Sequence, residues 1–421
     1  MNNGNIIGVT QRHTASRGTE NVLVLQGGGS LGAFACGVFK ALYDSGIRFD
    51  IVGGSSIGAV SAAIICGSKS DNPAKDLEDF WIEIAESSSL YSPTMPDLLT
   101  PYYDFVRGIF GARVMPLAPL NAIMFGVPKF FVPLWQTVMF EPSGTEVPFK
   151  WPMDWTHYYD HSPLVRTLEK YVDYEKISSS GGKKATLSSN NPRMITTAVN
   201  VLTAKALVFD SAKMEIKPKH ILASSAYSGY GFPWIEVDDN VYAWDGSLLS
   251  NTPLQEVIEA SPRNDKNVFI VENYPRKIDK LPANRSEVVD RTRDIIFSDK
   301  TIYDLRAWSH MSKQTALIER LYEVLEKMAG NDSNKQSVEK LVIDEIRREY
   351  ENLVGSYGAE ILSIHRIARS RMKSPHILKN ADFSIKTVKD LIRQGEQKAL
   401  DHLKGAEDID IAELTKSLYL P

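Results

Sequence analysis

The stretch IVGGSSIGAVSAAI, from Ile51 to Ile64, constrains the fold more than any other part of the sequence. Its β-branched start predicts a short strand, and its small apolar residues predict a helix from Ile57 to about Gly67. Only glycines and serines separate the two, so the chain must turn sharply with Ser56 at the apex. Glycine fits at Gly54 and Gly58, because a side chain two residues from the apex would collide with the other arm of the turn.

At such an apex the Ser56 hydroxyl would point away from the sheet, toward the amino end of the following helix. The free amides and the dipole of a helix start stabilise developing negative charge, which suits an activated nucleophile. A five-residue pattern alone leaves two other interpretations open: an ordinary glycine-rich turn and a simple anion-binding helix start.

The segment before this turn predicts a second strand-to-helix unit. Val22 to Leu25 form an apolar strand, followed by a glycine loop and a helix that ends near Gly46. Two consecutive units of this kind predict an α/β protein with a mainly parallel sheet covered by helices. Further strands are predicted at 194–202, 206–210 and 267–274.

The glycine loop GGGSLG, Gly27 to Gly32, has the spacing of a dinucleotide-binding loop. That function requires an acidic residue at the far end of the second strand, whereas Asp50 precedes that strand. A phosphate-binding P-loop requires lysine where this chain has Ala33. The remaining interpretation is that the amides of Gly28 and Gly29 face a carbonyl oxygen under attack, as in an oxyanion hole.

Composition narrows the class of protein. With 421 residues, 43% of them hydrophobic and 24% charged, the chain can bury a large core. A net charge of −4 gives no reason to expect nucleic acid as a partner. Cys36 and Cys66 are expected to be buried free thiols in a reducing compartment. Residues 1–20 form a polar arm without a secretory signal, so we expect a cytoplasmic protein, with export by another route left open.

A long apolar segment lies between Arg113 and Glu141, with Lys129 as its only charged residue. Its prolines argue against a membrane-spanning helix, so we expect an insertion over 90–155 that contains an irregular flap. The flap is predicted to shield an acyl-chain pocket and to contact a membrane or granule surface through exposed side chains; the candidates are Phe130, Phe131 and Trp135. A second hydrophobic cluster is an equally good interpretation.

After about Ser286 the sequence becomes helical. Two amphipathic stripes, over 317–328 and 338–353, are separated by the breaker GNDSN. A late strand, EILSIHRI, and a helix that begins after Ser384 and ends near Leu403 close the chain. We expect residues 276–421 to form a mainly helical extension whose late strand and helix pack on the core.

A third motif follows downstream, in VYAWDGSLLSNTPL. Asp245 ends a short strand there and is followed by Gly246, a pair that by itself commonly marks a turn. In order along the chain, the glycine loop, the Ser56 turn and Asp245-Gly246 together resemble the patatin-like phospholipases. The resemblance covers roughly 21–274, and YYDHSPLVRTLEKYVDYEKI and ILASSAYSGYGFP also look like bacterial members of that family.

The resemblance implies a three-layer α/β/α core over 21–275, with the apolar insertion and the C-terminal helical extension added to it. It makes Ser56 the nucleophile and Asp245 the general base of a dyad without histidine, and it requires neither metal nor cofactor. The supporting positions are the oxyanion loop, the turn and the residue after the base, namely Gly27, Gly28, Gly29, Gly32, Gly54, Gly58 and Gly246.

The implied activity is hydrolysis of lipid acyl esters of the phospholipase A or lysophospholipase type, with lipid or another aggregated acyl ester as the substrate. Leu31 stands where many members carry Arg or Lys, which weakens the case for an anionic head group. Three alternatives stay open: a depolymerase of storage polyesters, a non-catalytic lipid-binding protein, and a Ser-Asp-His hydrolase that uses His310 or His365.

Overall fold

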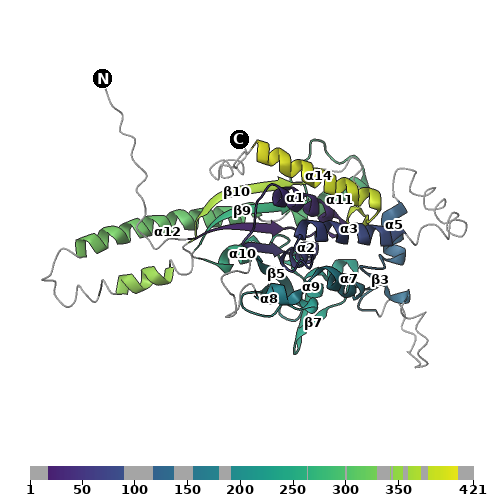
Figure 1. Cartoon of the computed structure of the whole chain (residues 1–421), viewed down its shortest axis with the longest axis horizontal. Helices are drawn as coiled ribbons and strands as arrows, with labels where there is room; N and C mark the ends of the chain where they lie inside the picture. The colour runs from purple at the N-terminus through teal and green to yellow at the C-terminus, as the bar shows by residue number, and fades with distance from the viewer. Residues whose placement is uncertain are drawn as a thin grey trace, which may run out of the picture.

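The protein is described by a computed structural model (Figure 1). The described residues are 18–89, 117–136, 155–179, 191–262, 264–298, 301–329, 342, 345–353, 359–370 and 378–405. Most of the polar arm, much of the insertion over 90–155, the breaker GNDSN and part of the second amphipathic stripe therefore lie outside them.

The main sheet has eight strands among the described residues. β1 (Thr19–Leu25) lies inside it, between β2 (Ile51–Gly54) and β9 (Asp265–Glu272), and runs parallel to both. The order is β10 (Ile361–Ala368), β9, β1, β2, β5 (Arg193–Asn200), β8 (Val241–Asp245) and β7 (Ile235–Asp238), with β6 (Ala206–Asp210) also paired to β5. The strands from β10 to β5 are parallel, so the predicted mainly parallel sheet is confirmed.

Side chains of β1 alternate between two hydrophobic clusters, one on each face of the sheet. Leu23 and Leu25 join a cluster with residues of α1 (Gly32–Asp44), α2 (Ile57–Cys66), α3 (Pro73–Ser89) and α14 (Ile385–Lys404). Val22 and Val24 join the other cluster, with residues of α10 (Leu254–Ala260) and α12 (Thr301–Ala329). The sheet is thus covered by helices on both faces, the three-layer α/β/α arrangement (Figure 1).

The C-terminal residues are built into this core. β10 adds an outer strand beside β9, and α14 crosses α1 where two glycines meet. A Cβ on Gly37 would lie 1.9 Å from Ile392 O, and one on Gly395 would lie 2.1 Å from Phe34 O. The two helices therefore touch backbone to backbone.

Shorter elements complete the layers around the sheet. They are α5 (Leu117–Phe125), α7 (Pro163–Tyr171), α8 (Tyr174–Ser179), α9 (Pro218–Ser225), α11 (Arg285–Phe297), the pair β3 (Val132–Pro133) and β4 (Tyr159–Asp160), and the 3-10 turns η1 (Gly29–Leu31), η3 (Ser228–Tyr230), η4 (Gly246–Leu248) and η5 (Lys379–Ala381). No helix among the described residues is both long and apolar enough to cross a membrane.

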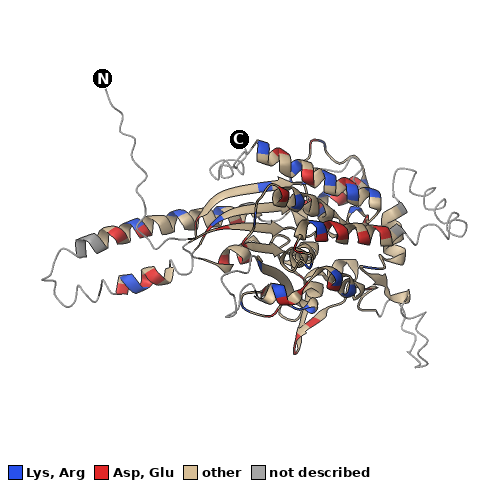
Figure 2. Ribbon diagram, in the orientation of Figure 1, with Lys and Arg blue, Asp and Glu red and all other residues tan. Residues whose placement is uncertain are grey.

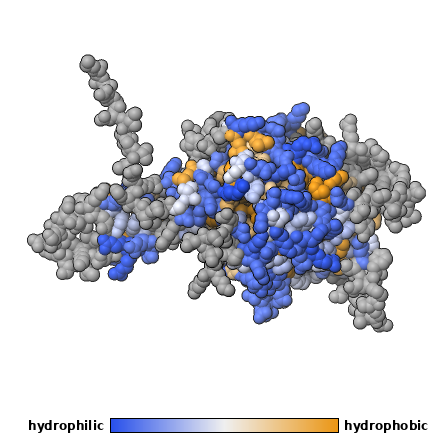
Figure 3. Space-filling view, in the orientation of Figure 1, coloured by the Kyte–Doolittle hydropathy of each residue, from blue (hydrophilic) through white to orange (hydrophobic). Residues whose placement is uncertain are grey.

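α12 projects beyond the sheet beside the helix over 345–353 (Figure 1), and the rings of Tyr322 and Tyr350 stack with centroids 4.0 Å apart between them. Figure 2 shows basic and acidic residues interspersed along α12 and α14. The face drawn in Figure 3 is mostly hydrophilic, with a few separate hydrophobic patches.

Candidate active site

Ser56 occupies the turn between β2 and α2, with backbone angles φ 57° and ψ −126°. Few residues other than glycine adopt a positive φ, so this backbone is strained. The glycines around it allow the turn to close: a Cβ on Gly54 would lie 2.2 Å from Gly58 O, and one on Gly58 would lie 2.2 Å from Leu25 O. A side chain at Gly54 would force β2 away from the start of α2, and one at Gly58 would push α2 away from β1.

Hydrogen bonds to α9 also hold the backbone of Ser56. Its amide donates to Ser224 O at 3.1 Å and lies 3.3 Å from Ser224 Oγ, at the end of α9. Thr196 Oγ1 of β5 donates to the same Ser224 hydroxyl at 2.9 Å. Sequence analysis did not identify Ser224, because a serine within ILASSAYSGYGFP carries no signal that it faces a turn far away in sequence.

Asp245 ends β8 and is fully buried. Its Oδ1 accepts hydrogen bonds from Ser247 N at 2.8 Å and Ser247 Oγ at 2.7 Å. Among the described residues nothing donates a hydrogen bond of normal geometry to Oδ2. Burial raises the pKa of Asp245 to about 6, although the nearby Ser56 hydroxyl and Ser247 act in the opposite direction. A carboxylate with such a pKa is well matched to accepting a proton near neutral pH.

Gly246 lets the chain that follows Asp245 pass close to β5. A Cβ on Gly246 would lie 2.4 Å from Thr197 Oγ1 and 2.5 Å from Thr197 O. Only glycine lets η4 begin directly against β5 at this point, so the predicted supporting position has a steric explanation.

The glycine loop presents fewer amides than the sequence suggests. Gly27 N donates to Asn251 O at 3.1 Å, and Gly32 N donates within the η1 turn. These two amides of the predicted oxyanion loop are therefore already engaged. A Cβ on Gly27 would lie 2.9 Å from Ser56 Cβ, and one on Gly32 would lie 2.8 Å from Ile57. Both glycines serve close packing. The amides of Gly28 and Gly29 remain as candidate donors, at residues that line a cavity with Ser56.

That cavity has a volume of about 230 Å³ and is lined mainly by apolar and aromatic side chains. Phe130 and Phe131 belong to its wall and are only 8% and 6% exposed. The prediction that they are exposed for docking on a lipid surface is wrong, because both pack in the core cluster, where each ring contacts Phe383. Trp135 is half-buried against Phe125, and their ring centroids are 6.4 Å apart.

No described histidine lines this cavity. His365 lies on β10, stacked on Phe269 with ring centroids 4.3 Å apart, and its Nδ1 is 3.1 Å from His402 Nε2. His310 is exposed on α12, which packs on the other face of the sheet. Neither histidine is placed to relay a proton between Ser56 and Asp245, so the triad alternative has no support here.

The described residues contain no group of three or more His, Cys, Asp or Glu side chains arranged to hold a metal ion. A strained serine and the residues of two loop amides line the cavity, and a buried carboxylate with one free oxygen lies beside the serine hydroxyl. Fold and site together define an α/β protein with the features of a hydrolase.

The chain belongs to the patatin-like phospholipase family. The family model matches residues 23–258, more than half of the chain, and contains both Ser56 and Asp245. Membership supports lipid hydrolase activity.

Curated relatives match shorter segments. Patatin-like phospholipase domain-containing protein 7 of Mus musculus is 33% identical over 91 residues, which is 22% of this chain and 6% of that protein. Patatin-like phospholipase domain-containing protein 6 of Homo sapiens is 34% identical over 91 residues, again 22% of this chain and 6% of that protein. Neuropathy target esterase sws of Drosophila persimilis is 49% identical over 47 residues, 11% of this chain and 3% of that protein. The matches thus span a small part of these relatives' length.

Among solved structures, VipD from Legionella pneumophila aligns at 14% identity with a TM-score of 0.36, covering 92% of this chain and 67% of that one.

Proposed function

We propose that the protein is a serine hydrolase of lipid acyl esters, in which Ser56 and Asp245 act as a dyad. The observation that carries the proposal is that the two side chains lie next to each other: Ser56 is held in a strained turn at the wall of the apolar cavity, and Asp245 is buried behind it, beside the Ser56 hydroxyl and with Oδ2 free. The esterase name of one relative agrees with this chemistry.

In the proposed mechanism, Asp245 accepts the proton from Ser56 Oγ while that oxygen attacks the ester carbonyl carbon. The carbonyl oxygen becomes an oxyanion that the Gly28 and Gly29 amides stabilise. When the ester bond breaks, Asp245 returns the proton to the leaving alcohol and an acyl group remains on Ser56. Water, deprotonated by Asp245, then releases the fatty acid and restores the serine.

The aromatic wall supports an apolar acyl group as the part of the substrate that enters the cavity. We infer that the physiological substrate is a lipid or another aggregated acyl ester, and a phospholipid or lysophospholipid is the first candidate from the family. Cys36 and Cys66 are both buried free thiols, which agrees with the cytoplasmic location we propose.

The proposal is tested by labelling with a fluorophosphonate. Wild-type protein should be modified at Ser56, and Ser56→Ala should lose both labelling and ester hydrolysis. Ser55→Ala is the matched control, because the neighbouring Ser55 hydroxyl is buried and makes no hydrogen bond among the described residues; it should label normally. Labelling of Ser56→Ala at the wild-type rate, or modification of another serine, would contradict the assignment.

The same proteins should be compared on phospholipid, neutral lipid and polyhydroxyalkanoate substrates. A polyester as the only substrate would favour the depolymerase alternative. Correctly folded wild-type protein that neither labels nor hydrolyses any of them would favour a non-catalytic lipid-binding protein.

A further inference from the structure

The glycine loop is contacted by η5, a turn from the C-terminal region that lies outside the residues matched by the family model. Asn380 Nδ2 donates to Gly28 O at 2.8 Å, and Ser30 Oγ donates to Lys379 O at 3.0 Å. A Cβ on Gly29, whose φ is +60°, would lie 2.5 Å from Asn380 O. Loop and turn therefore meet at backbone distance, with Asn380 itself lining the cavity.

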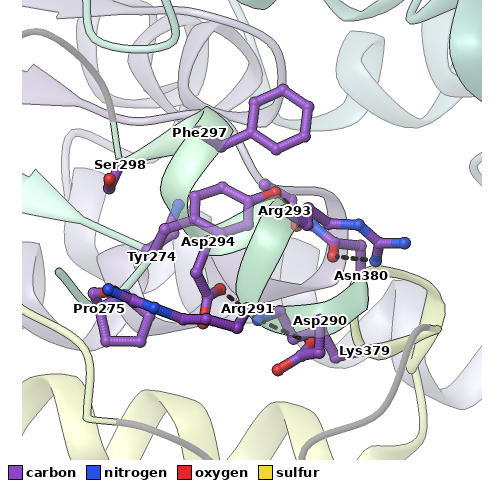
Figure 4. Close-up of polar contacts among 12 residues, drawn as sticks. Tyr274, Pro275, Asp290, Arg291, Arg293, Asp294, Phe297, Ser298, Lys379 and Asn380 are labelled. Carbon is purple, nitrogen blue, oxygen red and sulfur yellow. Dashed lines mark hydrogen bonds and ion pairs between the residues drawn. The ribbon is translucent and has the colours of Figure 1, made fainter. Parts of the chain in front are cut away.

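The side-chain amide of Asn380 has one possible orientation (Figure 4). Arg293 Nη1 of α11 donates to Asn380 Oδ1 at 3.0 Å. A guanidinium only donates hydrogen bonds, so the oxygen of the amide must face it. The nitrogen then faces the two acceptors on the other side, Gly28 O and the Tyr274 hydroxyl.

A buried ion cluster holds η5 in place. Lys379 Nζ lies 2.9 Å from Asp290 Oδ1 and also contacts Asp294 Oδ1, and all three side chains are at most 2% exposed. Figure 4 shows Lys379 reaching these two aspartates of α11 beside Asn380. Removing one member of such a cluster would leave a buried charge without its partner, so the backbone position of Asn380 is strongly fixed.

Fixing a carbonyl also fixes the neighbouring amide. In a trans peptide the C=O and N–H groups point in opposite directions. The hydrogen bond from Asn380 to Gly28 O therefore orients the Gly29 N–H away from Asn380. Asn273 acts in the same way one peptide earlier: its Nδ2 donates to Gly27 O at 3.1 Å, which orients the Gly28 N–H.

We propose that Asn380 is a positioning residue for hydrolysis: by holding Gly28 O, it keeps the Gly29 amide aimed at the oxyanion that forms on the substrate. The inference rests on the proposed function and assigns part of the active site to the C-terminal region. Asn380 acts on the transition state alone, because the ground-state ester carries little charge on its oxygen.

The test is Asn380→Leu, which keeps the size of the side chain and removes its donor. kcat should fall by about 10- to 100-fold with KM little changed, a smaller loss than the roughly 100- to 1000-fold expected for removing an oxyanion donor itself. A trifluoromethyl ketone that Ser56 converts to a tetrahedral oxyanion should lose affinity by the same factor. A non-hydrolysable ether analogue should bind as it does to wild type.

Two further variants sharpen the experiment. Ser30→Ala is the matched control, since it removes a contact with η5 that orients neither candidate amide; its kcat should stay within about twofold of wild type. Arg293→Met releases Asn380 Oδ1 and should lower kcat less than Asn380→Leu. If Arg293 acts through Asn380, the double variant should be no slower than Asn380→Leu alone.

The inference is overturned if folded Asn380→Leu keeps wild-type kcat and ketone affinity, or if ether and ketone lose affinity equally. Should Asn380→Leu fail to fold, Arg293→Met decides on the same two inhibitors. Failure of the proposed function is a different result: the wild-type protein itself would then show no turnover and no ketone adduct.

Discussion

The two sides of the cavity are built in different ways. On one side, Gly28, Gly29 and Ser56 present backbone and a single hydroxyl, and their places are set by close approaches that only glycine permits. On the other side, Phe130 and Phe131 present rings held by packing with other side chains. The first side can be recognised in the sequence, because its close backbone contacts require glycines at fixed positions. The second side cannot, because packed rings require only that the segment be apolar.

The largest effect on turnover should come from a change on the Ser56 side of the cavity. Asp245→Asn keeps the shape of the side chain but cannot accept the proton of Ser56, so kcat should fall by roughly 10³- to 10⁴-fold for esters of every chain length. Turnover of short and long esters, with circular dichroism to confirm folding, is the measurement. If His365→Ala were equally damaging while folded, the dyad would have to be replaced by a triad.

The pH profile should follow the same carboxylate. Asp245 must be ionised to act as a base and its pKa is raised to about 6, so kcat/KM should rise with pH through that value and fall about tenfold per unit below it. Ser247→Ala removes a hydrogen bond that stabilises the ionised form, so its midpoint should move to higher pH. A midpoint near 4, or one that Ser247→Ala leaves unchanged, would contradict Asp245 as the base.

The smallest effect on turnover should come from a change on the side of the cavity formed by Phe130 and Phe131. Phe131→Leu should lower kcat/KM for long acyl chains by a few-fold and leave short esters unchanged, with a loss of about 1 kcal/mol in the free energy of unfolding. Phe39→Leu is the matched control, because Phe39 is buried in the same cluster but does not line the cavity. If both variants gave the same chain-length profile, the aromatic wall would not be the acyl site.

The sequence predicts well what its motifs encode. The parallel order of β1 and β2, the turn at Ser56 and the strand ending at Asp245 all follow from short local patterns. The exposure predicted for Phe130 and Phe131 is wrong because an apolar segment has the same composition whether it faces lipid or a cavity.

Other parts of the site could not be predicted from the sequence. Asn380 lies in a polar stretch without a motif, and its contact with Gly28 depends on an ion cluster formed between α11 and η5. The position of β10 could not be predicted either. Its apolar residues predict a strand, but only its pairing with β9 makes it the outer strand of the sheet.

The position of β1 inside the sheet has a consequence for folding during translation. Val22 pairs with Ile51 on one side and with Val268 on the other, so the second partner leaves the ribosome long after the first. Pairings so distant in sequence close large loops and slow folding. During translation β1 keeps an unpaired edge, a target for chaperones or for aggregation, until β9 has been synthesised. The proposed active site is therefore built around a strand that gains its second neighbour only after β9 has been made.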